Sequence, residues 1–211
     1  MHLSLPHLLN LAVHIGAGLA AILLGLALLA QVKGTALHRK RGRVFVLLTL
    51  VVCATGAIGS ALFRFVPLFA VLTLLVSYQL LSGWHAVYTR AAGPNRIDAL
   101  LAVGAGAGAI GLLPVLFSGG MEGAASSVIY ATLGALAFLL TYDAARWCFP
   151  RSWHALLWRH EHIYKMVASL FGMLSSAAGN LITVGQPWSQ LVPSVLGMLT
   201  IAVLIWRAAR A

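Results

Sequence analysis

The sequence predicts an all-α integral membrane protein, a seven-helix bundle whose N-terminus lies outside and whose C-terminus lies in the cytoplasm. Of its 211 residues, 61% are hydrophobic and 9% are charged, whereas about 25% of the residues of a soluble domain are charged. Seven apolar stretches reach the length of about 20 residues that a membrane-spanning helix requires. The four acidic residues are too few for an acid-rich active site or a soluble nucleotide-binding domain.

We expect a single transmembrane domain over residues 1–211, in which glycine and proline mark the ends of the helices. The first stretch has neither the basic start nor the small-residue cleavage site of a secretory signal, so we expect it to be retained. The breaks contain Gly34, Pro67, Pro94, Gly119-Gly120, Pro150 and Pro187. The predicted spans lie at about 7–31, 43–63, 67–89, 97–117, 125–147, 160–184 and 190–207.

The 14 lysine and arginine residues determine the predicted orientation. All of them except Arg64 belong to the connectors after the first, third and fifth helices, to the C-terminal tail, or, for Lys165, to the same side of the sixth helix. The positive-inside rule makes this side cytoplasmic. The charges stand in short connectors, so they indicate contact with anionic lipid head groups, above all at residues 33–43, and not with nucleic acid. Together with the richness in Ala, Gly, Leu and Arg, this predicts a bacterial inner-membrane protein.

Small residues recur on one face of the fourth helix. Gly104, Gly108 and Gly111 form a ridge that is expected to let another helix backbone come close.

The sixth helix carries the most informative pattern, a strip of polar and sulfur-containing side chains along one face. Ionisable residues at membrane depth are costly, so we expect this strip to face the bundle interior. Glu161 precedes Lys165 by one helical turn and is its predicted partner. Asn180, about 27 Å along the helix from His162, is expected to contact His14 and Ser60. The strip comprises His162, Lys165, Met166, Ser169, Met173, Ser176, Asn180 and Thr183.

The eight histidines are the other unusual feature of the sequence. On the third helix, Tyr78, Ser82 and His85 share one face, and His85 is expected to lie at the depth of His162. Histidines on two facing helices can bind a haem iron or another metal ion. We therefore take His85, His162 and His38 as candidate cofactor ligands.

Several functions stay open at this point. In one interpretation the inner histidines are hydrogen-bonded to neighbouring helices, with His154 and His160 as interfacial anchors. They could instead hold a b-type haem in a membrane redox component, or a divalent metal in a lipid hydrolase with Glu161 as the base. A carrier of a small solute or lipid would use the strip of the sixth helix as its path. A membrane assembly role without chemistry is the remaining alternative.

Short motifs recur along the chain: His14-Ile15 on the first helix, Lys33-Gly34, His38-Arg39 and Gly42 in the connector, Ser82-Gly83-Trp84, and His162-Ile163. In these motifs the chain resembles an uncharacterised family of bacterial multipass membrane proteins of unknown function. The resemblance implies a multi-helix bundle and draws attention to His14, His38 and His162, but it implies no reaction.

Overall fold

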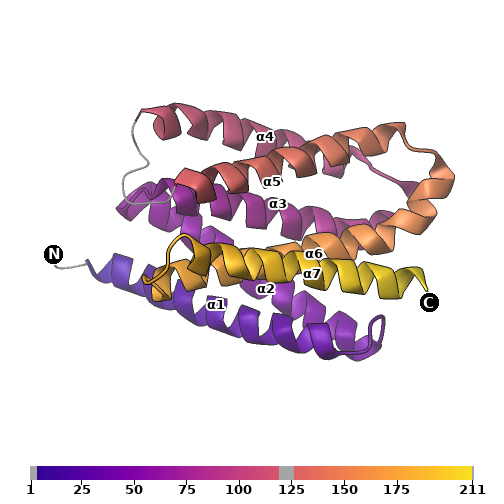
Figure 1. The fold of residues 1–211 in the computed structure, drawn as a ribbon, viewed down its shortest axis with the longest axis horizontal. Helices are drawn as coiled ribbons and strands as arrows, with labels where there is room; N and C mark the ends of the chain where they lie inside the picture. The colour runs from indigo at the N-terminus through magenta and orange to yellow at the C-terminus, as the bar shows by residue number, and fades with distance from the viewer. Residues whose placement is uncertain (1–3, 119–125, 211) are drawn as a thin grey trace.

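The computed structural model describes residues 4–118 and 126–210, and these residues form seven α-helices and no strand. The helices run roughly along one axis, and the two ends of the chain lie at opposite ends of the bundle (Figure 1). Three short turns of other helix types adjoin them, η1 (Gly59–Phe63), η2 (Arg90–Ala92) and η3 (Arg146–Cys148). The seven are α1 (Leu5–Ala30), α2 (Ala36–Ile58), α3 (Pro67–Thr89), α4 (Arg96–Phe117), α5 (Ser126–Ala145), α6 (Arg151–Leu181) and α7 (Trp188–Ala209).

The predicted span at 67–89 coincides with α3, and those of α1, α4, α5 and α7 differ from the structure by a few residues. Two helices begin earlier than predicted. The side chain of Thr35 caps α2 by accepting a hydrogen bond from the backbone N–H of His38, and α6 begins directly after Pro150, because the charged residues that follow each cap are good helix formers. The break at Gly119-Gly120 lies outside the described residues.

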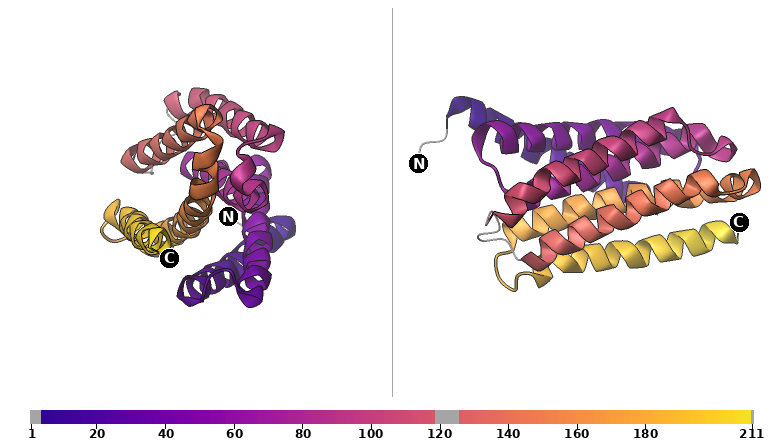
Figure 2. Two further views of the ribbon diagram at one scale, coloured as in Figure 1. Left: turned by 90° about the vertical axis from the view of Figure 1, so that its right-hand side faces the viewer. Right: turned by 90° about the horizontal axis from the view of Figure 1, so that it is seen from above.

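Six helices are long enough and apolar enough to cross a membrane, and α6 is the exception. Its polar strip lowers its hydropathy, but at 31 residues it is about 46 Å long. Seen along the bundle axis, α6 and α3 lie at the centre, with α1 and α2 on one side, α4 and α5 on another, and α7 against α6 (Figure 2). The most polar helix thus lies beside α3 at the centre of the bundle.

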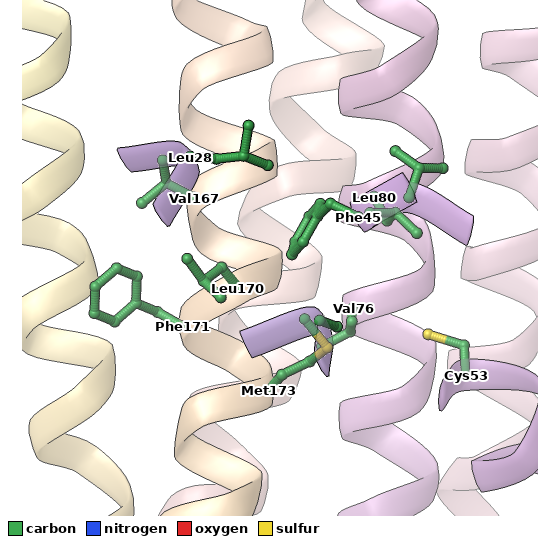
Figure 3. Packing of buried hydrophobic residues seen from close by; sticks show 11 residues of the cluster. Leu28, Phe45, Cys53, Val76, Leu80, Val167, Leu170, Phe171 and Met173 are labelled. Carbon is green, nitrogen blue, oxygen red and sulfur yellow. The ribbon is translucent and has the colours of Figure 1, made fainter. Parts of the chain in front are cut away.

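The core between α1, α2, α3 and α6 is made of large apolar side chains. Phe45, Leu80 and Leu170 interdigitate at its centre (Figure 3). Two further clusters join α3 to α4 and α5. Glycine allows a close approach of α3 and α6, because a Cβ atom at Gly83 of α3 would stand 2.6 Å from the Cβ of Lys165 on α6.

The predicted glycine ridge on α4 is wrong as a packing surface. Only Gly108 has a neighbour, Leu74 of α3, whereas Gly104 and Gly111 face open space among the described residues. Val103, on the same helix, is also exposed, whereas Ala105 and Leu116 are buried.

Candidate functional site

Four charged side chains meet in the interior of the bundle, and we call them the charge cluster: Asp143, Arg146, Glu161 and Lys165. Lys165 has no exposed surface, and the other three are at most 6% exposed. The Nζ of Lys165 donates to both oxygens of Asp143, at 2.7 and 2.8 Å. Arg146 lies between the two acids, with Nη1 3.2 Å from Asp143 Oδ1 and Nε 2.8 Å from Glu161 Oε1. The four formal charges cancel.

Two tyrosines extend the charge cluster to the surrounding helices. The hydroxyl of Tyr78 on α3 donates to Asp143 Oδ2 at 2.6 Å, and that of Tyr142 on α5 donates to Glu161 Oε1 at 3.0 Å. The cluster therefore ties α3, α5 and α6 together. Asp143 accepts bonds from Tyr78, Lys165 and Arg146, so its lone pairs are occupied and it is poorly placed to act as a catalytic base.

The sequence-based partner of Lys165 is wrong: Lys165 pairs with Asp143, and Glu161 pairs with Arg146. Asp143, Arg146 and Tyr142 are functional candidates that the sequence reasoning missed. One signal could have found them, because Asp143 is an acid inside a predicted span and Arg146 follows it by three residues. Such a spacing puts both side chains on one helix face.

A cavity of about 640 Å³ occupies the other half of the bundle, between α1, α2, α3 and α6. It lies toward the end that holds the N-terminus of α1 and the turn from α2 to α3 (Figure 1). All four residues predicted for the outer part of the path, His14, Ser60, Ser176 and Asn180, line it. Asn10 and Arg64 also line it. The polar strip of α6 thus lines this cavity toward the C-terminal end of the helix.

The contact predicted between His14, Asn180 and Ser60 does not form as hydrogen bonds among the described residues. The Nδ1 of His14 lies 2.9 Å from Thr55 Oγ1, and Asn10 donates to the backbone oxygen of Thr55 at 3.1 Å. Asn180 instead donates to the carbonyl of Ser176 on its own helix. The three predicted residues share one cavity and face each other across it.

Between the cavity and the charge cluster, the polar side chains of α6 and of the facing α3 are buried. Ser169 is fully buried and donates to the carbonyl of Met166, and Ser82 is buried and donates to the carbonyl of Tyr78. The strip therefore faces the interior at Lys165 and Ser169, as predicted, but the prediction is wrong for Thr183, which is exposed and lies beyond the end of α6. Between the cavity and the charge cluster the strip passes through packed side chains.

The structure does not bring His85 and His162 together. The Nδ1 of His162 lies 2.9 Å from the carbonyl oxygen of Gly83 on α3. His85 follows Gly83 by two residues, so its side chain leaves the opposite side of α3, where Nε2 lies 3.1 Å from Asn95 Oδ1 and 3.6 Å from Asp98 Oδ2. Asn95 and Asp98 form the capping box of α4, so His85 supports a helix start.

The third candidate ligand, His38, lies near the start of α2. Its Nδ1 is buried and has no hydrogen-bond partner in the described part of the chain. Neither His38 nor His162 lines the cavity. Over residues 4–118 and 126–210, no group of three or more His, Cys, Asp or Glu side chains is arranged to hold a metal ion.

No protein-family model, no curated protein and no solved structure matches this chain.

Proposed function

We propose that the chain is a seven-pass protein of the bacterial inner membrane, with its N-terminus outside, that carries a small amphipathic solute or lipid. The observation that carries the proposal is the cavity between α1, α2, α3 and α6. Its volume of about 640 Å³ falls in the range of roughly 300–1,000 Å³ that is usual for small-molecule sites. Its wall combines apolar side chains with a few polar groups, as such sites do.

The membrane assignment is supported by the outer surface of the bundle. Large apolar side chains on α1, α4, α5 and α7 are exposed, among them Leu23, Val103, Phe138 and Val203. A soluble monomer rarely exposes contiguous apolar patches larger than a few hundred Å², whereas lipid covers such side chains without cost. The basic residues gathered at the end opposite to the cavity support the orientation.

The carrier assignment is supported by the contrast between the two halves. The path along α6 is open beside Ser176 and closed beside Ser169, where the core and the charge cluster seal it. A carrier gives access to its site from one side at a time. The observed arrangement corresponds to a state that faces outward.

Cysteine labelling tests this proposal. The two native cysteines, Cys53 and Cys148, are first replaced by alanine. Ser176→Cys, in the cavity, is expected to react with a small membrane-impermeant thiol reagent in whole cells and to be protected by an amphipathic solute. Ser175→Cys is the matched control, because Ser175 is buried and its hydroxyl lies 2.8 Å from that of Ser194 on α7. Equal rates at the two positions would contradict the cavity assignment.

Transport and orientation have separate readouts. Ser169→Cys is expected to be labelled from the cytoplasmic side only while solute is being carried, and complete protection under every condition would make the protein a receptor instead of a carrier.

Cys148 is exposed at the inner end and should react with an impermeant maleimide in inverted vesicles but not in whole cells. The opposite result would reverse the orientation.

A redox component with a cofactor on His38 and His162 is the second candidate. It is favoured by the Nδ1 of His38, which is buried and has no hydrogen-bond partner among the described residues. A Soret band that shifts on reduction in purified protein would support it, with loss of the band in His162→Ala and retention in His154→Ala. A colourless, metal-free preparation after haem-supplemented expression would remove this candidate and leave the carrier untouched.

A further inference from the structure

Arg64 is the exception to the charge pattern of this chain. Thirteen of the 14 lysine and arginine residues stand at the other end of the bundle or next to it. Arg64 alone belongs to the end where the cavity lies, and it is the single charged side chain among the described residues that line the cavity. The positive-inside rule does not explain a cation on this side of the membrane, so we looked for its role in the residues around Arg64.

The local backbone holds Arg64 at the cavity mouth. The last turn of α2 widens into the π-helical turn η1, Gly59–Phe63, and the backbone N–H of Arg64 donates to the carbonyl of Gly59 at 3.0 Å. The ring of His7 stacks on Phe63 with a centroid distance of 4.6 Å, which joins α1 to this turn. Single π-turns occur frequently at functional sites.

The middle of the cavity is polar but uncharged. The hydroxyl of Thr55 donates to the carbonyls of Val51 and Val52, so toward His14 it acts as an acceptor and the Nδ1 of His14 carries the proton. The neutral imidazole then keeps an acceptor lone pair on Nε2. No carboxylate lines the cavity among the described residues, so this part of its wall carries no formal negative charge to bind a cation.

The inner end of the cavity is apolar. Ile22, Val52, Val76 and Met173 line this part, which leads into the packed core. From His7 to Ile22 the lining residues of α1 cover 15 positions, or about 22 Å. The cavity is therefore elongated along the helices, with a cationic mouth, a polar middle and an apolar floor.

We propose that the cavity takes a single-chain amphiphile with an anionic head group, a long-chain carboxylate or a monoacyl phosphate. The head group pairs with Arg64 at the mouth, and the chain extends inward to Val76 and Met173. This assignment rests on the proposed function, because it names the substrate class of the same cavity. The shape and the charge both favour it over a two-chain lipid or a cationic solute.

The test measures protection of Ser176→Cys from the thiol reagent by four solutes with the same chain: dodecanoate, dodecyl phosphate, dodecanol and dodecyltrimethylammonium. The protein is held in nanodiscs of neutral lipid, and each solute is used below its micellar concentration. A charge-assisted bond to Arg64 is worth roughly tenfold or more in affinity, so the two anions should protect at about tenfold lower concentration than dodecanol. Each CH2 removed from the chain should weaken protection by about fourfold.

Arg64→Gln should abolish the advantage of the anions and leave protection by dodecanol unchanged. Arg96→Gln is the matched control, because Arg96 is an exposed arginine at the start of α4 and lies outside the cavity. Stronger protection by dodecyl phosphate than by dodecanoate would assign the monoacyl phosphate, and the reverse order would assign the carboxylate.

The outcomes separate the two claims. If dodecanol protects as well as the anions, or if Arg64→Gln changes nothing, the anionic substrate class is overturned while the cavity remains a solute site. If the cationic solute protects best, the substrate class is overturned in the same way. If none of the four protects Ser176→Cys, the solute-binding function itself is contradicted.

Discussion

The two halves of α6 use the same polar periodicity in opposite ways. At the inner end, Lys165 meets an acid that α5 contributes, and the strip is closed by the charge cluster. At the other end, Ser176 lines a cavity together with residues of α1 and α2. The side chains of the neighbouring helices thus determine whether a polar strip is closed by ion pairs or lines a cavity.

The largest effect is expected where the inner half depends on charge balance. Lys165→Met leaves the buried Asp143 with Arg146 as its single remaining cation, and breaking a buried pair costs about 3–5 kcal/mol. Thermal unfolding in nanodiscs should show a large loss of stability. The double variant Lys165→Met, Asp143→Leu should recover much of it, because the Arg146–Glu161 pair stays balanced. A single variant as stable as the parent protein would mean that the cluster does not hold α5 to α6.

The second effect concerns the contact that brings α3 against α6. Gly83→Ala places a methyl group 2.6 Å from the Cβ of Lys165, and overpacking of this kind costs about 1–3 kcal/mol. Thermal unfolding measures the loss.

Gly104→Ala is the control for this contact, because no neighbour lies within 4 Å of its Cβ position. It should be neutral or stabilise the protein by about 0.5–1 kcal/mol through helix propensity. Equal destabilisation by the two variants would show that the close approach at Gly83 has no special role.

A smaller effect is expected in the outer half. His14→Ala removes the hydrogen bond to Thr55, and such interhelical bonds in membrane proteins are worth about 0.6 kcal/mol on average. Stability should change little, while Ser176→Cys should react faster because the cavity is wider. A loss comparable to that of Lys165→Met would place His14 in the framework of the bundle instead of the cavity wall.

The smallest effect is expected at the cavity rim. Asn180 is exposed and bonded within its own helix, so Asn180→Ala should alter the free energy of unfolding by less than about 0.5 kcal/mol. Thermal unfolding beside His14→Ala gives the comparison, and a larger loss at Asn180 would show that the rim is built by contacts between helices.

Periodicity along single helices predicted much of this structure. The limits of α3 and the inward direction of Lys165 and Ser169 follow from hydropathy and from the cost of polar groups in lipid. The depth of a residue could also be predicted from its position along the helix. His14, Ser60, Ser176 and Asn180 were expected at one depth, and all four line one cavity. These properties depend on residues close in sequence.

Pairing between helices could not be predicted in the same way. Depth alone suggested that His85 faces His162, but the rotation of α3 about its axis turns Gly83 toward α6 and His85 toward α4. The partner of Lys165 was missed for a similar reason, because Asp143 precedes it by 22 residues and reaches it only after α5 and α6 fold back on each other. Arg64 was recognised as an outlier in charge, but the cavity beside it is formed by four separate segments.

The length of α6 has a mechanical consequence. Ser176 and Lys165 lie 11 residues apart on one unbroken helix, or about 16 Å, so the segment between them acts as a stiff rod. A solute that displaces α6 at Ser176 would tilt this segment of the helix. The tilt would strain the ion pair of Lys165 with Asp143. Binding of a solute in the cavity would then alter the charge cluster, which the solute does not contact.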